Sequence, residues 1–305
     1  MLPKEPVRRP QLGFIYAPPF RIQGVSIAGE ATAIQIPELD LGFDIGECPR
    51  AMLSSNTIAL SHGHMDHIAA LIYYFSQRNF QGMGTGTVVC HPDLEQPIRG
   101  LMDALVGIER QRTPYEIVTL EPEKEIPLKG NVVLRAFSTI HTAPSLAYAC
   151  VEKRSKLRAD LVGMPQEQIV LLKEKGEEIT ETHEIPLVTY MGDTLWGKHF
   201  DRPEVLDAKV LITECTFIEP GHRKRASVGK HPHLDDIVRL LEMSTCETVV
   251  LTHLSRRTHL GQARKVLDEA LPAQHRDRVL LLMDTRANKQ RYERQVAEAE
   301  ATARG

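Results

Sequence analysis

The chain has no long apolar run, and this limits where it can reside. No stretch of its 305 residues approaches the ~20 apolar residues that a helix needs to cross a bilayer. The segment 1–6 also lacks the apolar core of a signal peptide, so we expect neither membrane insertion nor export.

Low-complexity linkers and repeats of fixed period are missing too, and the length suits one large core or two small domains.

Paired cysteines and a strong net charge are also missing. The five cysteines are widely spaced, and no two of them form a CxxC pattern. We therefore expect reduced, mostly buried thiols in a cytoplasmic protein. A formal net charge of -3 argues against non-specific coating of nucleic acid, but it leaves room for a local basic patch.

Strand and helix patterns alternate along the chain. The first twenty residues contain several prolines and predict an irregular lead-in, and later apolar runs between turn residues predict strands. Apolar residues at helical spacing predict helices between them. Predicted strands cover 25–28, 33–36, 41–46, 57–60, 88–91, 115–120, 132–139, 145–151, 187–191, 210–217, 248–253 and 279–283. Predicted helices cover 68–77, 93–110, 166–175, 234–243, 260–271 and the tail from 287. Two sets of strands favour an α/β fold in which two sheets face each other with helices outside.

Four metal-ligand side chains lie within six residues, where a predicted strand turns into a helix. They are His62, His64, Asp66 and His67. Neutral imidazoles and a carboxylate are typical zinc ligands. Because side chains alternate along an extended backbone, we expect His62 and His64 to hold one metal and Asp66 and His67 a second one nearby. This spacing resembles the signature of the metallo-β-lactamase superfamily, which implies an αββα sandwich.

Three further residues stand at predicted strand ends: His141, Asp193 and His253. With them the inventory suits a two-zinc site in which a carboxylate is shared and a hydroxide between the cations is the nucleophile. Asp66 is close enough to that hydroxide to accept its proton. Asp44 either orients a ligand imidazole or is a turn carboxylate. The predicted first set is His62, His64, His141 and Asp193, and the second is Asp66, His67, His253 and Asp193.

The neighbouring motifs resemble ribonuclease Z, the tRNA 3′-processing endonuclease, in the short form found in plants. The resemblance extends from about 25 to 284, and segments 43–49, 61–68, 192–194, 213–217 and 252–257 carry it. It implies a zinc-dependent endoribonuclease that removes the 3′ trailer of precursor tRNA by metal-hydroxide hydrolysis. It also implies two zinc ions per subunit and a homodimer in which the arm of one subunit serves the site of the other.

The resemblance also implies roles for single residues. Asp66 is catalytic, and Glu214 pairs with His231 to protonate the leaving ribose oxygen, as a carboxylate that fixes an imidazole tautomer can do. His233 competes for the same role, and spacing does not separate the two histidines. Ser255 and Arg257 would bind a phosphate of the substrate, although a solvated surface charge is the plain alternative for Arg257.

A basic segment interrupts the second set of predicted strands. Residues 1–305 are expected to form a single domain, with an insertion at about 152–183 that resembles a shortened tRNA-binding arm. Its cluster is Lys153, Arg154, Lys156 and Arg158. The glycine- and proline-rich arm of longer bacterial forms is missing, and nearby acids dilute the charge, so a solvated helix face is the alternative. Two other functions stay open: a hydrolase of small phosphodiesters or esters, and a metal-stabilised RNA-binding protein without turnover.

Overall fold

The first sheet contains the N-terminal half of the described chain. A computed structural model describes residues 12–304, so the segment 1–6 used in the signal-peptide prediction lies outside the described residues. Seven strands pair in sequence order, and the last four are parallel to one another. They are β1 (Gly13–Ala17), β2 (Phe20–Ile27), β3 (Ala31–Ile36), β4 (Leu41–Phe43), β5 (Thr57–Ala59), β6 (Gly86–Cys90) and β7 (Tyr115–Thr119).

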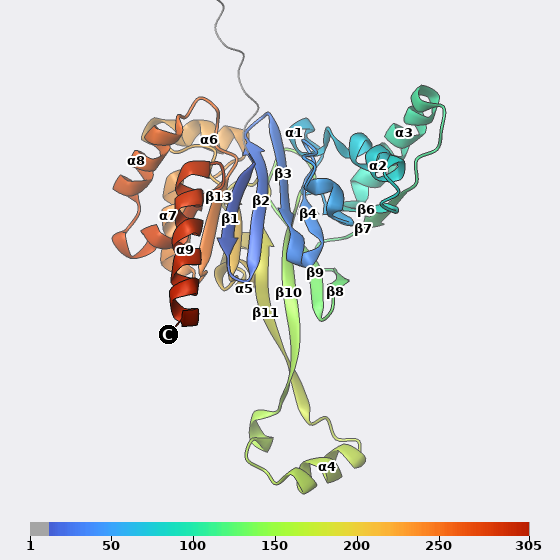
Figure 1. Cartoon of the computed structure of the whole chain (residues 1–305), viewed down its shortest axis with the longest axis vertical. Coiled ribbons are helices and arrows are strands. Elements are labelled where there is room, and N and C mark those ends of the chain that lie inside the picture. Colours follow the sequence, from blue (N-terminus) through green and yellow to red (C-terminus); the bar gives the residue numbers. More distant parts are fainter. Residues whose placement is uncertain (1–11, 305) are drawn as a thin grey trace, which may run out of the picture.

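The second sheet also has seven strands in sequence order, and it faces the first (Figure 1). Its antiparallel part is β8 (Glu125–Lys129), β9 (Val132–Ser138), β10 (Leu146–Leu157) and β11 (Thr180–Tyr190). Its parallel part continues from β11 through β12 (Val210–Glu214), β13 (Thr248–Thr252) and β14 (Val279–Leu281). The parallel strands of each sheet therefore end at a common edge, where the ligands of α/β proteins usually bind.

Helices cover the outer faces of both sheets. The first sheet carries α1 (Met65–Ile68), α2 (Leu71–Phe80) and α3 (Pro92–Glu109). The second carries α5 (Pro203–Leu206), α6 (Arg223–Gly229), α7 (Leu234–Met243) and α8 (Leu260–Ala270), and α9 (Thr285–Arg304) lies against β1. Helix α7 shows why these residues form a helix: His233 and Asp236 make a capping box, and the buried residues repeat at helical spacing.

Three apolar clusters fill the spaces between the layers. One lies between the sheets and includes Phe43, Tyr148 and Tyr190. Another packs α7 and α8 on the second sheet, and the third packs α2 and α3 on the first. This arrangement confirms the predicted αββα sandwich. Four of the five cysteines are buried and all five are free thiols, as expected. Among residues 12–304, no helix is long and apolar enough to cross a membrane.

Several elements differ from the sequence-based prediction, among them β1, α6, β10 and β11. Strand β1 lies in the segment expected to be irregular, and its alternate residues Ile15 and Ala17 are buried. Helix α6 covers a segment for which the sequence predicts no helix, and Ala226 is its one buried residue, so the segment has almost no apolar face that periodicity could reveal. Strands β10 and β11 extend far beyond 145–151 and 187–191 as a protruding hairpin that carries α4 (Gln166–Glu174) (Figure 1). Outside the core the hairpin pairs Lys153 with Glu184 instead of alternating apolar and polar residues, so its pattern hides the strands.

Candidate active site

The residues predicted as metal ligands gather where strands of both sheets end, beside α1 (Figure 1). The turn after β5 and helix α1 supply four of them, and the loop after β9 supplies His141. Asp193 follows β11 by three residues, and His253 follows β13 directly. Glu214 is the last residue of β12. Residues spread over nearly two hundred positions of the chain thus meet at one edge, because parallel strands place their carboxyl ends together.

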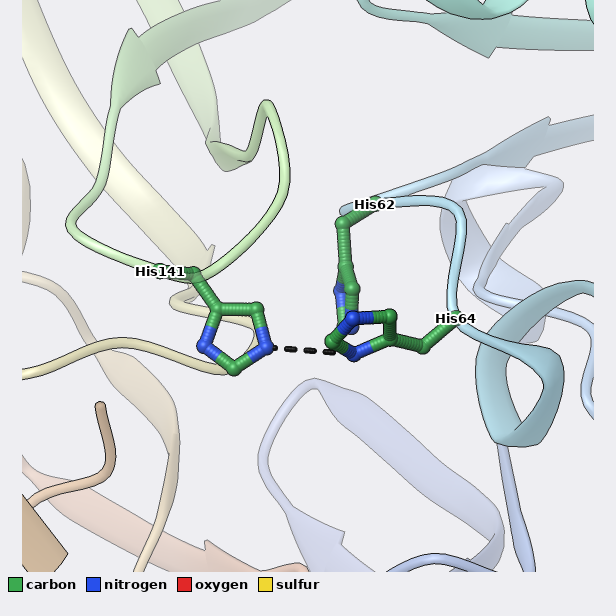
Figure 2. Close-up of side chains that lie close together, drawn as sticks. All are labelled: His62, His64 and His141. Carbon is green, nitrogen blue, oxygen red and sulfur yellow. Dashed lines mark hydrogen bonds between the residues drawn. The ribbon is translucent and has the colours of Figure 1, made fainter. Parts of the chain in front are cut away.

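His62, His64 and His141 form one group of facing imidazoles (Figure 2). The Nδ1 of His64 lies 3.2 Å from the Nε2 of His141. The ring of His62 is fully buried and lies 4.5 Å from that of His64 and 4.7 Å from that of His141, measured between centroids. Its Nδ1 lies 3.0 Å from the Ser61 hydroxyl, whereas its Nε2 is buried and has no hydrogen-bond partner.

Asp66, His67 and His253 form a second group, and Asp193 lies against it. The Nε2 atoms of His67 and His253 are 3.4 Å apart, and the Asp193 Oδ2 lies 3.4 Å from each of them. The Oδ2 of Asp66 is 3.3 Å from the Nε2 of His253. Asp193 also groups with His62, so its carboxylate stands between the two sets.

These separations fit divalent metal ions with tetrahedral ligands. Zinc binds imidazole nitrogen at about 2.0–2.1 Å, which places neighbouring tetrahedral ligands about 3.3 Å apart. Ligand atoms are 3.2–3.4 Å apart in three pairs, His64–His141, His67–His253 and Asp66–His253, and 3.6 Å apart between Asp66 and His67. The unpartnered Nε2 of His62 is the clearest sign, because a buried ring nitrogen without a partner costs free energy unless something binds it. The seven predicted ligands therefore make a donor set suited to binding divalent metal.

A buried carboxylate holds one of these imidazoles in place. Asp44 accepts a hydrogen bond from the Nδ1 of His67 at 2.8 Å and further ones from the backbone N–H and the hydroxyl of Ser61. The Tyr190 hydroxyl donates to the same carboxylate at 2.5 Å from the facing sheet. Of the two interpretations left open for Asp44, the structure favours the partner that orients a ligand imidazole. Tyr190 carried no signal of this role, since its position resembles that of any core aromatic residue.

Glu214 stands at the centre of a second buried network. Its carboxylate accepts hydrogen bonds from the Thr194 backbone N–H at 2.7 Å and from the Thr216 hydroxyl at 2.6 Å. The Thr216 oxygen lies 2.9 Å from the Nδ1 of His253. Thr216 thus joins Glu214 to a predicted metal ligand. Sequence reasoning did not single out Thr216, although it lies two residues after Glu214 in a motif that we had identified.

The structure separates the two histidines that competed as partners of Glu214. The Nδ1 of His231 lies 2.8 Å and 3.0 Å from the two carboxylate oxygens of Glu214. His233 instead caps helix α7: its Nδ1 accepts from the Asp235 N–H at 3.2 Å, and its Nε2 lies 2.9 Å from the Glu219 carbonyl oxygen. Both ring nitrogens of His233 are therefore engaged in local structure.

Burial and neighbouring charges set the protonation of these groups. Burial, together with the nearby His67 ring, lowers the pKa of His62 to about 2, so its imidazole is neutral, as a metal ligand must be. Burial favours a raised pKa for Asp193, but the His253 and His67 rings outweigh it and hold the pKa of this carboxyl well below its ordinary value. Burial likewise favours a lowered pKa for His231, but the Glu214 carboxylate outweighs it and raises the pKa of this imidazole.

The predicted phosphate ligands lie on the loop that follows β13. Ser255 is half-buried and accepts a hydrogen bond from the Arg257 backbone N–H at 3.3 Å. The Arg257 side chain is exposed, and within residues 12–304 its guanidinium makes no ion pair. Ser255 follows the predicted metal ligand His253 by two residues. The structure therefore places the start of this loop beside the candidate metal site.

Sequence comparison finds relatives that match most of the chain. A chloroplastic tRNase Z of Arabidopsis thaliana is 30% identical over 251 residues, covering 81% of this chain and 71% of the relative. A second tRNase Z of the same plant is 29% identical and covers 86% and 95%. A ribonuclease Z of Methanococcus maripaludis is 31% identical and covers 66% and 71%. A scan against models of protein families gives no match.

Solved structures share the fold. A metallo-β-lactamase fold protein of Bacillus subtilis superposes with a TM-score of 0.58 at 17% identity, covering 88% of this chain and 94% of that one. The short form of human tRNase Z gives a TM-score of 0.56 at 16% identity and covers 90% and 96%. At these identities the structural similarity establishes the αββα sandwich alone.

Proposed function

The chain belongs to the ribonuclease Z family, and on that basis we propose that it cuts precursor tRNA directly after the discriminator nucleotide. The products are a tRNA with a 3′-hydroxyl and a trailer with a 5′-phosphate. The observation that carries the proposal is the His231–Glu214 pair beside the candidate metal ligands, since phosphodiester hydrolysis needs both an activated water and an acid for the leaving oxygen. We place the reaction in the cytoplasm, in keeping with the free thiols.

Seven side chains of this chain would hold two zinc ions. When bound, the ions supply a water of near-neutral pKa and offset the charge of the phosphate. Asp66 is held for proton transfer, because its Oδ2 accepts a hydrogen bond from the Gly29 N–H at 2.8 Å. The proposed ligands are His62, His64, His141 and Asp193 for one ion, and Asp66, His67, His253 and Asp193 for the other.

His231 is proposed to protonate the 3′-oxygen as it leaves phosphorus. Glu214 accepts the Nδ1 hydrogen of His231, which leaves the Nε2 hydrogen as the one that can be given away. Against the effect of burial, the Glu214 carboxylate raises the pKa of His231 above its ordinary value, which favours the protonated ring that an acid must supply. Ser255 and Arg257 are proposed to hold a neighbouring phosphate of the RNA, because their loop continues directly from His253.

A precursor tRNA with a 3′ trailer tests the proposal directly. We expect one cut after the discriminator nucleotide, mapped by sequencing the product ends, and loss of that cut in Asp66→Ala. The matched control is Asp268→Ala, since Asp268 is an exposed carboxylate on α8, away from the candidate site and the hairpin. If the protein hydrolyses a small diester, loses that activity in Asp66→Ala and never cuts the precursor, the tRNA proposal is wrong. The protein would then be a hydrolase of small substrates.

One observation favours that small-substrate alternative. Three of the four basic residues expected to grip tRNA are paired with acids of their own chain: Lys153 with Glu125, Arg154 with Glu152, and Arg158 with Asp160. Their charge is largely neutralised within the fold. Any RNA grip by the hairpin must then come from its other lysines.

Helix α4 and the end of β10 supply those lysines. Lys156, Lys173 and Lys175 are exposed and make no ion pair among the described residues. We propose that the segment 152–183 is an RNA-binding arm of a single domain, and that these lysines contact tRNA phosphates. Changing all three to Glu is expected to raise KM for precursor tRNA by about tenfold or more at 0.15 M salt. Hydrolysis of a small diester should not change, and an unaltered KM for precursor tRNA would contradict the arm.

Two exposed apolar stripes support a homodimer. Tyr73 and Phe80 lie seven residues apart on α2, and Leu101 and Ile108 lie seven apart on the adjacent α3 (Figure 1). Phe80 is 84% exposed and Ile108 79%, which are high values for apolar side chains of this size on two helices in contact. The double variant Phe80→Asp with Ile108→Asp is expected to sediment as a monomer at concentrations where the parent is a dimer. Val228→Asp, at an equally exposed valine on α6, is the control and should leave the dimer intact.

The Thr216 hydroxyl gives a test that leaves the metal ligands in place. Thr216→Val keeps the shape of the side chain but removes the group between Glu214 and His253. We expect kcat to fall about 10–100-fold, since partners of metal-bound histidines typically contribute this much. Thr216→Ser should restore most of the rate. Equal rates for the Val and Ser variants would show that the hydroxyl does not position the site.

A further inference from the structure

A cavity of about 450 Å³ lies next to the candidate metal site, and Ser255 is the one lining residue to which the proposed function gives a role. Its walls come from the end of β2, the loop between β13 and α8, and the residues before α9. Apolar atoms dominate the lining, and Ile27, Leu254, Leu260 and Met283 supply them. We call this cavity the side pocket.

Hydrogen bonds tie the side pocket to the metal site. Ser26, which lines the pocket, accepts a hydrogen bond from the backbone N–H of His253 at 2.9 Å. Two residues further on, the Ala28 N–H donates to the Leu254 carbonyl at 3.2 Å, and the next residue, Gly29, donates to Asp66. The same two backbone segments therefore form a wall of the pocket and hold two predicted metal ligands. A substrate bound at the metals would pass directly beside the pocket.

The chemistry of the pocket suits a neutral, flat and mostly apolar group with hydrogen-bonding edges. Arg256 lines it, but its guanidinium is paired with Glu30, so no free cation is left to attract a phosphate. His259 also lines the pocket, and its exposed side chain makes no capping hydrogen bond at the start of α8. An imidazole can stack on a nucleobase, and a hydroxyl such as that of Thr258 can pair with its edges.

We propose that the side pocket receives the base of an unpaired nucleotide one or two positions from the scissile phosphate. The proposal rests on the proposed function, because it takes a single-stranded RNA end at the metal site as its premise. Three observations indicate a base as the occupant. The pocket is continuous with the metal site, its lining is mostly apolar, and Arg256 is paired with Glu30. Proteins commonly recognise single-stranded RNA by placing unstacked bases against apolar and aromatic surfaces. The pocket would thus help to set which bond is cut.

The test combines two changes, removal of one base from the RNA and filling of the pocket in the full-length protein, and compares their separate and joint effects. Precursor tRNAs are made with one abasic nucleotide at the discriminator or at the first or second trailer position. Leu260→Trp fills the pocket, since Leu260 stands at its rim and is 37% exposed. Met243→Trp is the control, because Met243 is 39% exposed at the end of α7 and does not line the pocket.

At one of the three positions, base removal is expected to lower kcat/KM about tenfold in the parent and in Met243→Trp, a size typical of losing one apolar contact group. In Leu260→Trp the same base removal should change kcat/KM less than twofold, because the pocket is already filled. If base removal has the same effect in Leu260→Trp as in the parent at all three positions, the proposal is wrong.

A binding measurement decides the question even if no precursor is cut. With ¹³C-methyl methionine, the signal of Met283, identified by its loss in Met283→Leu, should shift when a uridine trinucleotide is added. It should not shift with the same backbone lacking bases. A base-dependent shift without precursor cleavage would support the pocket and contradict the tRNA function. If the precursor is cut correctly, the Met283 signal does not shift and Leu260→Trp does not change the effect of base removal, the pocket proposal is wrong. The proposed function would then stand without it.

Discussion

Asp193→Ala is expected to abolish precursor cleavage, with kcat/KM falling at least about 10⁴-fold. The Asp193 Oδ2 lies 3.4 Å from the Nε2 of both His67 and His253, and the residue also groups with His62. Its carboxylate stands between the two predicted sets. Its loss would remove a ligand from both proposed ions and leave buried imidazoles without a nearby anion, so both metal binding and catalysis should fail.

Measuring the metal content of the parent and of Asp193→Ala, together with their cleavage rates, tests this prediction. We expect about two zinc ions per subunit in the parent and one or fewer in Asp193→Ala. Asp44→Asn is the comparison for which we expect a smaller effect. Asp44 contacts the Nδ1 of His67 and not its Nε2, which is the atom predicted to face a metal. That variant should lose 10–100-fold in activity or metal affinity. Two retained ions in Asp193→Ala with a rate within tenfold of the parent would show that the carboxylate is not shared.

Part of this site could be predicted from the sequence because its signal is local. Four predicted ligands lie within the six-residue stretch 62–67: His62, His64, Asp66 and His67. No common structural element needs such a cluster. His141, Asp193 and His253 are single residues, and only their position at strand ends pointed to them. The structure brings all seven together because parallel strands of the two sheets end at one edge.

The supporting contacts could not be predicted, because they join residues that are distant in sequence. The Tyr190 hydroxyl reaches Asp44 across 146 positions and from the opposite sheet. The bond between Thr216 and His253 depends on the register of β12 against β13. The hairpin of β10 and β11 lacks an apolar face over its outer half, so periodicity gives no signal there.

His231→Ala is expected to lower kcat about 10²–10⁴-fold, as the loss of a general acid typically does. His233→Ala is the matched control, two residues away and of the same chemical type. Because His233 caps α7 through its Nδ1, its loss should reduce the free energy of unfolding by about 1 kcal/mol with little change in kcat. Activity assays and denaturant unfolding of both variants therefore give opposite patterns. If His233→Ala is the variant that loses activity, the two roles are reversed.

The pH dependence of cleavage gives a further check on His231. A general acid acts only while it is protonated, so kcat should fall as the pH rises through the raised pKa of His231. The Glu214 carboxylate is what raises that pKa, against the effect of burial. In Glu214→Gln the pKa should therefore drop, and the fall in kcat should move to lower pH. With a substrate whose leaving group needs no proton, such as a nitrophenyl diester, neither His231→Ala nor Glu214→Gln should lose the large factor seen with RNA. An equal loss on both substrates would place His231 in metal binding instead of leaving-group protonation.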